Sequence, residues 1–458
     1  MARLVLVSNR VPSPADRGVR AGGLVAALSE SISGGVWFGW SGQAGDVTGT
    51  EAAQRRSRGV TYATIDLSHA DYERYYVGFS NGTLWPLLHY RLGLMEFERE
   101  QYHAYLDVNR AFAAALSPLL QPDDIIWVHD YHLIPLGAML RDKGVANRIG
   151  FFLHVPFVPP SAYAVMPNGA ALLSALGAYD LVGVQTRSDL QNLADCLREF
   201  LGWTVEGGDC VRGGDGRATR LGAFPIGIDA DGFAEMAVQG VDSAEGKRLR
   251  DSLGRRALIM GVDRLDYSKG LPNRFNGYSR LLARCPEHHQ RITYVQVAAR
   301  SRDDVPKYQA IRRELDRLAG SVNGRFGTID WVPLRYVTRP APRATLAGFF
   351  RMARVGLVTP LRDGMNLVAK EYIAAQDAED PGVLVLSRFA GAVHELPEAL
   401  VVNPIDVDEI AEAIDAALRM PLDERKARWQ RMWERVRTDS AAAWRKSFLA
   451  MLSDGTRG

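Results

Sequence analysis

The sequence predicts an α/β protein made of two doubly wound domains with a cleft between them. Short apolar runs rich in β-branched residues alternate with helical stretches along nearly the whole chain. Continuous apolar strands of this kind are typical of parallel sheets that helices cover on both faces. A length of 458 residues favours two or three domains, and a more polar stretch at 229–256 separates two sets of predicted strands.

The first set of strands comprises RLVLVSN (3–9), DIIWVH (124–129), RIGFFLHV (148–155) and LVGVQT (181–186). The second comprises ALIMGV (257–262), ITYVQVA (292–298), VGLVTP (355–360) and VLVLS (383–387). Helices are expected at 96–120, 305–320 and 421–451, and a hairpin tip at 211–220. The expected domains are 1–228, completed by a C-terminal helix at about 440–458, and 229–439. The tryptophans Trp429, Trp433 and Trp444 are expected to anchor the last helix by packing.

Composition narrows the class of protein. Apolar residues make up 47% and charged residues 24%, which is ordinary for a globular protein. A net charge of +2 gives no global basic field, so no nucleic-acid partner is expected. The three cysteines are widely spaced and predict reduced thiols in a cytoplasmic protein. No apolar run reaches the ~18 residues of a membrane span, and the N-terminal run is too short for a signal peptide.

In the first half, polar and glycine-rich residues follow the predicted strands. Open α/β sheets bind ligands at this end of their strands. Arg10 ends the first strand, and Gly22 and Gly23 precede a helix, where backbone amides can approach an anion closely. A plain loop explains the glycine pair equally well. Asp130 follows the strand at 124–129, and His154 lies near the end of the strand at 148–155.

In the second half the strand ends carry more charge. Arg264 and Lys269 follow the strand at 257–262 and together suit a diphosphate, with a solvated turn as the alternative. Arg302 follows the next strand. In TPLRDGMNLVAKEY (359–372), Asp363 is expected to accept hydrogen bonds from sugar hydroxyls, and Glu371 from two ribose hydroxyls. The amides from Gly364 to Leu367, which include Met365 and Asn366, are expected to hold phosphate oxygens.

Other patterns give weaker signals. The triplets Asp229–Asp231 and Asp406–Asp408 each head a helical pattern, so helix capping explains them better than metal binding. His129 and His132 have the spacing of a metal pair, but no third ligand lies near them in sequence, so no metal site is expected. The aromatic stretch at 75–91 predicts a turn at 80–82. With WFGWSG (37–42), it suits either a ligand wall or core packing.

Together, segments along nearly the whole chain resemble the trehalose-6-phosphate synthase family, retaining glycosyltransferases of the GT-B fold with two Rossmann-like domains. The segments are LVLVSNR, WFGWSG, SNGTLWPLLHYR, WVHDYHLIP, IGFFLHVPF, PIGID, RLDYSKGLPNRF, TPLRDGMNLVAKEY and PGVLVLSRFAGA. The resemblance implies transfer of glucose from a nucleoside diphosphate glucose to glucose 6-phosphate, giving trehalose 6-phosphate in trehalose biosynthesis. It also implies a homo-oligomer, a dimer or tetramer, without a metal or other cofactor. In the usual proposal for the family, the acceptor attacks from the leaving-group face and the departing phosphate takes its proton.

The resemblance also assigns roles by position. The implied catalytic residues are His154, Arg264, Lys269 and Asp363. The implied donor-binding residues are Gly22, Gly23, Arg264, Lys269, Gly364, Met365, Asn366, Leu367 and Glu371. The implied acceptor-binding residues are Arg10, Trp40, Tyr76, Trp85, Asp130 and Arg302.

One segment departs from the family pattern. QVAARSR (296–302) has no proline before its serine, and it lies where the nucleotide base is expected, so UDP-, GDP- and ADP-glucose all remain open. A related transferase with another acceptor is a rival, either a glucosylglycerol-phosphate synthase or a pseudo-glycosyltransferase. The acceptor-side residues favour glucose 6-phosphate. A non-catalytic sugar-phosphate sensor is a further rival, but Arg264, Lys269, Asp363 and Glu371 are all retained.

Overall fold

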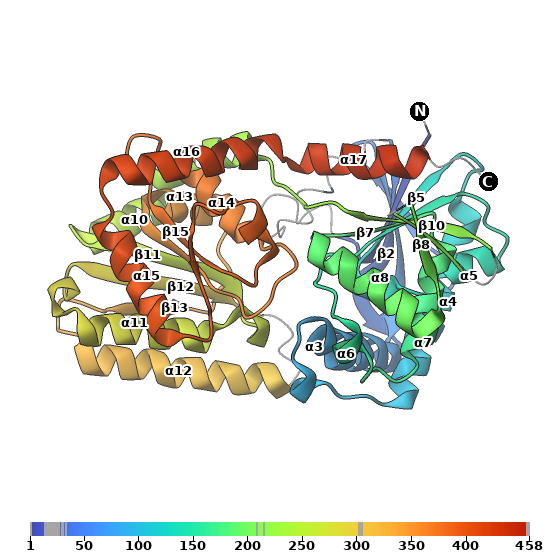
Figure 1. The fold of residues 1–458 in the computed structure, drawn as a ribbon, viewed down its shortest axis with the longest axis horizontal. Helices are drawn as coiled ribbons and strands as arrows, with labels where there is room; N and C mark the ends of the chain where they lie inside the picture. The colour runs from blue at the N-terminus through green and yellow to red at the C-terminus, as the bar shows by residue number, and fades with distance from the viewer. Residues whose placement is uncertain are drawn as a thin grey trace. The chain divides into compact units, whose positions relative to one another are not determined.

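The computed structural model describes residues 2–12, 28, 32, 34–207, 209–213, 216–300 and 306–454. Figure 1 shows two compact units, and we describe each by itself. The first unit holds the described residues of Met1–Arg17, Leu28–Pro225 and Trp444–Gly458, and the second includes Ile226–Ala443. Over the described residues, none of the helices has the length and apolar character needed to cross a membrane.

A mostly parallel sheet forms the centre of the first unit. The order of its described strands is β3-β4-β2-β1-β5-β6-β7-β10-β9-β8. The strands from β4 to β10 pair in parallel, whereas β3 at one edge and β9 and β8 at the other pair antiparallel. The strand bounds are β1 Leu4–Arg10, β2 Val36–Gly45, β3 Ala53–Ser57, β4 Val60–Ser68, β5 Ile125–His129, β6 Arg148–Phe152, β7 Leu181–Val184, β8 Thr204–Glu206, β9 Cys210–Arg212 and β10 Ala218–Ala223.

Helices of several kinds surround this sheet. The α-helices are α2 His69–Asp71, α3 Trp85–Leu88, α4 Arg99–Leu116, α5 Leu136–Asp142, α6 Pro160–Tyr163, α7 Gly169–Ala175, α8 Arg187–Leu201 and α17 Ala441–Ser453. A π-helix, η1, spans Tyr72–Leu84, and short 3-10 turns are η2 Leu92–Leu94, η3 Ser117–Leu119, η4 Tyr131–Leu133 and η5 Leu176–Ala178. Trp444 of α17 is buried, with its ring 4.9 Å from that of Trp127 on β5, which is the predicted packing role.

The second unit contains a wholly parallel sheet. Its described strands have the order β13-β12-β11-β14-β15-β16, in which the chain winds outward in both directions from β11. The bounds are β11 Ala257–Arg264, β12 Ile292–Ala299, β13 Leu334–Val337, β14 Ala353–Val358, β15 Val383–Ser387 and β16 Leu400–Val402. This order puts the ends of β11 and β14 side by side, although they are far apart in sequence.

Helices cover both faces of the second sheet (Figure 1). On one side lie α11 Leu271–Arg284, α12 Pro306–Phe326 and α15 Val407–Arg419. On the other lie α9 Ala230–Val241, α10 Ala244–Leu253, α13 Arg343–Met352, α14 Leu367–Ala375 and α16 Leu422–Thr438. Short 3-10 turns are η6 Tyr267–Lys269, η7 Pro286–His288 and η8 Gly391–His394. Two parallel-sheet α/β units confirm the predicted fold class.

Two local expectations need correction. The turn predicted at 80–82 is wrong, because these residues continue η1 into α3. The side chain of Asn81 donates to the carbonyl oxygen of Tyr76 at 2.7 Å and accepts from the hydroxyl of Tyr131 at 3.0 Å, which holds the wide helical turn. The helix predicted at 421–451 is divided into α16 and α17. The stretch at 37–42 is part of β2.

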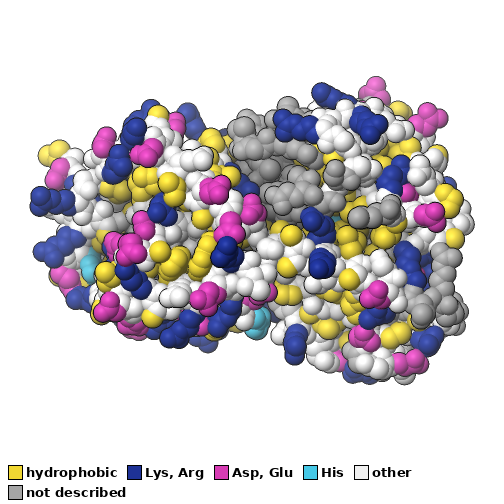
Figure 2. All heavy atoms as spheres, turned by 90° about the horizontal axis from the view of Figure 1, so that it is seen from above, with side chains coloured by type: hydrophobic (Ala, Val, Ile, Leu, Met, Phe, Trp, Pro, Cys, Tyr) yellow, Lys and Arg dark blue, Asp and Glu magenta, His cyan; other side chains and the backbone are white. Residues whose placement is uncertain are grey.

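Both acidic triplets cap helices as expected. The side chain of Asp229 accepts from the amide of Gly232 at the start of α9. That of Asp406 accepts from the amides of Asp408 and Glu409 at the start of α15. Over the described part of the face in Figure 2, basic and acidic side chains are interspersed, in keeping with the near-zero net charge.

Candidate functional site

The strand ends of the second unit bring two of the predicted residues together. The amide of Leu361, just after β14, donates to the carbonyl oxygen of Ser268 in η6 at 2.7 Å. Gly270 has a φ of +65°, and a Cβ there would lie 2.5 Å from the carbonyl oxygen of Thr359, so this approach requires glycine. Because the two segments touch, Lys269 reaches Asp363, with Nζ 2.5 Å from Oδ2.

The carboxylate of Asp363 is held from several directions. Asn366 donates its side-chain Nδ2 to the same Oδ2 at 3.0 Å. The backbone amide of Asp363 donates to Phe389 and its carbonyl oxygen accepts from Gly391, both in the segment after β15. The side chains of Lys269 and Asp363 are 10% and 15% exposed, so the ion pair is largely but not wholly shielded from water. The tip of β14 therefore presents a fixed carboxylate beside a fixed ammonium group.

The predicted phosphate-binding amides lie at the start of α14. Asn366 is the residue before this helix and has a left-handed backbone, with φ 74°. The first N–H groups of a helix have no partner within the helix and favour an anion. Arg264 is exposed at the last residue of β11. The predicted Gly22, Gly23 and Arg302 lie outside the described residues.

Glu371 and its neighbour Lys370 have different surroundings. The carboxylate of Glu371 lies 3.1 Å from Nη2 of Arg343, the first residue of α13. Burial raises the pKa of Glu371, and the charge of Arg343 opposes that rise. Lys370 is fully buried, with its Nζ 2.6 Å from Glu395 and 2.8 Å from the carbonyl oxygen of Ile226. Lys370 thus fixes the helix, whereas Glu371 remains partly exposed.

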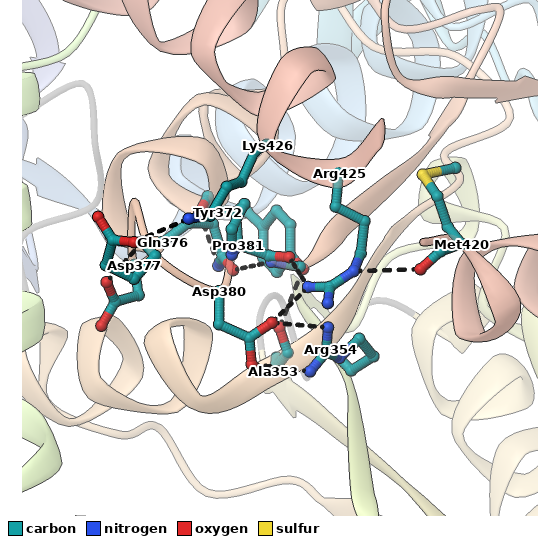
Figure 3. Close-up of polar contacts among 12 residues, drawn as sticks. Ala353, Arg354, Tyr372, Gln376, Asp377, Asp380, Pro381, Met420, Arg425 and Lys426 are labelled. Carbon is teal, nitrogen blue, oxygen red and sulfur yellow. Dashed lines mark hydrogen bonds and ion pairs between the residues drawn. The ribbon is translucent and has the colours of Figure 1, made fainter. Parts of the chain in front are cut away.

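The C-terminal end of α14 is fixed by a second polar network (Figure 3). Tyr372 donates to the carbonyl oxygen of Ala353 at 3.1 Å, and Gln376 donates to that of Tyr372 at the same distance. In the adjoining loop, Asp380 pairs with Arg354 at 3.0 Å and with Arg425 of α16 at 2.7 Å. Because both ends of α14 are held, the orientation of Glu371 is set by the fold.

Sequence reasoning missed Arg274, a fully buried arginine on α11. Its guanidinium donates to Asp263 at 2.5 Å, to Gln296 at 2.9 Å and to Thr359 Oγ1 at 3.0 Å. It also donates to the carbonyl oxygen of Lys269 at 3.3 Å. These bonds link β11, β12, the segment after β14 and η6 beneath the Lys269–Asp363 pair. A lone arginine in a helical stretch gave no signal of this role.

Aromatic side chains cluster near the strand ends of the first unit. The guanidinium carbon of Arg10 lies 5.8 Å from the ring centroid of Trp40, its register partner on β2. The ring of Tyr76 lies 5.8 Å from that of Trp40 and 5.9 Å from that of His132, nearly parallel to the latter. The structure therefore brings Arg10, Trp40 and Tyr76 into one cluster. Trp85 is buried, with its ring 5.7 Å from that of Tyr131.

Asp130 and His154 lie beside each other at the ends of β5 and β6. Asp130 has an unusual φ of 76°, and its Oδ1 accepts from the backbone amide of His154 at 3.2 Å. The ring of His154 shares a hydrogen bond of 3.0 Å with that of His129. Burial lowers the pKa of His154 to about 3 and that of His129 well below its usual value. Both imidazoles are therefore neutral near pH 7.

One group of potential metal ligands lies elsewhere. Cys285, Glu287 and Asp415 have ligand atoms within 4.8 Å of one another. Arg419 forms ion pairs with both carboxylates, 2.8 Å away in the case of Asp415. A guanidinium already neutralises these acids, so the cluster gives no argument for a cation.

The comparisons with known proteins decide the family. The sequence model of glycosyltransferase family 20 matches residues 13–454. The chain belongs to glycosyltransferase family 20. A relative named trehalose-6-phosphate synthase from Sinorhizobium fredii is 49% identical, over 98% of each chain.

Solved structures of this family agree over the full fold. An α,α-trehalose-phosphate synthase (UDP-forming) from Burkholderia xenovorans, in complex with glucose-6-phosphate, has a TM-score of 0.95 at 46% identity, covering 99% of this chain and 100% of that one. A family member from E. coli, bound with UDP-2-fluoro glucose, has a TM-score of 0.94 at 45% identity with the same coverage. The family membership that the sequence segments predicted is confirmed.

Proposed function

We propose that this protein is an α,α-trehalose-phosphate synthase that transfers glucose from UDP-glucose to glucose 6-phosphate. The products are α,α-trehalose 6-phosphate and UDP, and the configuration at the donor carbon is retained. The observation that carries the proposal is the Lys269–Asp363 pair, 2.5 Å apart at adjacent strand ends of a glycosyltransferase family 20 fold. In this proposal the ammonium group binds the diphosphate, and the carboxylate beside it accepts hydrogen bonds from sugar hydroxyls. The ligands in the two solved relatives, glucose-6-phosphate and UDP-2-fluoro glucose, support the same pair of substrates.

In this proposal the second unit binds the donor. Lys269 and Arg264 neutralise the diphosphate as it departs, which is electrostatic stabilisation by fixed charges. Asp363 accepts hydrogen bonds from glucose hydroxyls, and Glu371 accepts them from the ribose. Gly22, Gly23 and the amides of Gly364, Met365, Asn366 and Leu367 contact the phosphates.

The first unit supplies most of the acceptor contacts. Arg10 and Tyr76, together with Arg302, bind the 6-phosphate, and Trp40, Trp85 and Asp130 orient the sugar. His154 contacts the donor glucose as a neutral ring, because its pKa is about 3. In the reaction the bond from the glucose anomeric carbon to phosphate breaks, and a bond to the anomeric oxygen of glucose 6-phosphate forms. The proton of that hydroxyl passes to the leaving phosphate.

The proposal extends to the setting of the enzyme. The donor and acceptor domains are 229–439 and 1–228, the latter completed by about 440–458. Cys196, Cys210 and Cys285 are all free thiols, which supports a reducing, cytoplasmic location. A homo-oligomer, dimer or tetramer, is part of the proposal.

An assay of the pure protein tests it. UDP-, GDP- and ADP-glucose are each combined with glucose 6-phosphate, glycerol 3-phosphate and free glucose, and products are identified by mass and by anomeric configuration. We expect a disaccharide phosphate from UDP-glucose and glucose 6-phosphate, with both anomeric linkages α. If only glycerol 3-phosphate gave a product, the protein would be a glucosylglycerol-phosphate synthase, the rival function.

A further inference from the structure

Glu371 is held by an arginine that no part of the proposed mechanism uses. Nη2 of Arg343 lies 3.1 Å from Oε1 of Glu371, and the two side chains are 21% and 13% exposed. The guanidinium carbon of Arg343 lies 5.0 Å from the ring centroid of Phe233 on α9. A planar guanidinium stacked on a ring has little freedom left, so the carboxylate that it contacts is fixed as well.

The helices that provide this arrangement are packed rigidly. A Cβ on Gly348 of α13 would lie 2.3 Å from the carbonyl carbon of Gly240 on α9, so the two backbones are in direct contact. This contact fixes Arg343 relative to Phe233. On the other side, α14 packs against α9 and α13, which brings Glu371 to the same point.

The position of Arg343 is unfavourable for its own helix. It is the first residue of α13, where the helix dipole is positive and a cation is disfavoured. The preceding residue, Pro342, makes no side-chain capping bond that could compensate for the cation at the start of the helix. Two interactions outside the helix offset this cost, the ion pair with Glu371 and the contact with the ring of Phe233.

The charges around Glu371 come from few elements. Arg343 of α13 faces it, whereas on η8 the acid Glu395 pairs with Lys370. From α9 the uncharged ring of Phe233 contacts Arg343, and from α16 the indole of Trp429 donates to the carbonyl oxygen of Ile373 on α14. Burial raises the pKa of Glu371, and Arg343 is the charge that opposes this effect. An ionised carboxylate accepts from two hydroxyls, whereas a protonated one must use an oxygen as a donor.

We propose that Arg343 is a positioning residue for the nucleotide: its ion pair with Glu371 keeps that carboxylate ionised and aimed at the ribose. The inference rests on the proposed function and deepens its donor site. In this proposal Arg343 acts through Glu371 and contacts neither the sugar nor the reacting atoms.

The test is calorimetric titration of UDP-glucose, without acceptor, at several pH values between about 5.5 and 8. UDP-glucose has no group that titrates in this range, so any pH dependence belongs to the protein. The variants are Arg343→Gln, Arg343→Lys and the matched control Arg351→Gln. Arg351 lies at the other end of the same helix and pairs with Asp377 at 2.9 Å. It also donates to the carbonyl oxygens of Ala375 and Gln376 at the C-terminal end of α14, so Arg351→Gln removes support from the helix that carries Glu371 without removing the partner of Glu371.

We expect Arg343→Gln to weaken UDP-glucose binding about tenfold at pH 7, the loss expected for one hydrogen bond to a charged group. Its affinity should fall further as the pH falls, because Glu371 then takes up a proton at a higher pH than in the wild type. Arg343→Lys should restore part of the affinity, and Arg351→Gln should match the wild type. At saturating donor, kcat of Arg343→Gln should stay within about threefold of wild type.

A double variant separates positioning from general damage. If Arg343 acts through Glu371, Arg343→Gln should cost almost nothing further in a Glu371→Gln background. Wild-type affinity and pH dependence in Arg343→Gln would overturn the inference and leave the proposed function intact. Equal losses in Arg343→Gln and Arg351→Gln would overturn it as well. Wild-type protein that binds none of UDP-, GDP- or ADP-glucose would overturn the proposed function, and this inference with it.

Discussion

The two units differ in how their candidate site residues are held. In the second unit, charged groups pair with each other: Lys269 with Asp363 and Glu371 with Arg343. In the first unit, rings pack against one another. Trp40, Tyr76 and His132 form a row, in which Tyr76 is tilted against Trp40 and stacked on His132, and the neutral rings of His129 and His154 share one hydrogen bond. A charged ligand that binds in the second unit replaces part of an existing ion pair. A sugar that binds in the first unit contacts rings whose positions are already fixed.

This difference predicts different sensitivities. When one partner of a largely buried ion pair is removed, the charge of the other is left uncompensated. Rings act through shape and area, so their replacement changes fit more than charge. Variants in the second unit should therefore alter charge-dependent donor affinity and turnover, and those in the first should alter acceptor binding.

The largest effect is expected below the donor region, at Arg274. Arg274→Met leaves the buried Asp263 without its main partner, and breaking a buried pair costs about 3–5 kcal/mol. The midpoint of urea unfolding of the second unit should fall accordingly. Arg312→Met is the control: its surface pair with Asp316, 4.0 Å apart, should contribute less than about 1 kcal/mol. Equal midpoints for the two variants would mean that the Arg274 network does not support this region.

Asp363→Asn should have the next largest effect. Loss of one preorganised electrostatic contact typically lowers kcat by about a hundred- to a thousandfold. Free UDP should bind at least as tightly as to the wild type, because Lys269 is released from its ion pair. Steady-state rates and calorimetry with UDP measure the two quantities. A tenfold loss of UDP affinity would place Asp363 at the phosphates and not at the sugar.

Arg302→Ala should act on the acceptor. A charge-assisted contact to a phosphate contributes about 1.5–3 kcal/mol, which corresponds to a rise of about ten- to a hundredfold in the KM for glucose 6-phosphate. Arg300→Ala, two residues away, is the control and should leave this KM unchanged. A raised donor KM in Arg302→Ala, with the acceptor KM unchanged, would move the residue to the donor side.

The smallest effect concerns pH and the histidine pair. The folded pKa of His154 is about 3, below the usual value of 6.5. Between these values the unfolded chain binds a proton that the folded protein does not, so the free energy of unfolding falls as the pH falls. Thermal midpoints at pH 7.5 and 5.5 should therefore differ less in His154→Gln than in the wild type. An equal decrease in both would show that His154 is not neutral when folded.

The sequence predicted the buried part of the fold better than its edges. The run predicted at 383–387 has the same bounds as β15, which is buried throughout, whereas β3, AQRRS, has mostly exposed side chains and no apolar pattern. Glycine, serine and asparagine at 80–82 are typical of turns, but tertiary bonds from Asn81 stabilise a π-helix instead. Local propensity cannot foresee such bonds.

The site shows the same limit. Residue types at strand ends indicated Lys269 and Asp363 separately, but their contact depends on the pairing of β11 with β14. Arg274 and Arg343 gave no sequence signal, because their roles come from partners on other elements. The individual ligand contacts of all these residues remain predictions.

The central claim is that the ion-paired residues of the second unit bind the donor, whereas the row of rings in the first unit, with Arg10, binds the acceptor. One pair of kinetic measurements tests this claim most directly. Arg10→Met and Glu371→Gln are each assayed for both Michaelis constants, with the other substrate saturating. We predict that Arg10→Met raises the KM for glucose 6-phosphate about tenfold or more and leaves that for UDP-glucose within about threefold, and that Glu371→Gln does the reverse. The division of donor and acceptor binding between the two units is wrong if Arg10→Met mainly raises the KM for UDP-glucose or Glu371→Gln mainly raises that for glucose 6-phosphate. It is also wrong if either variant raises both constants equally.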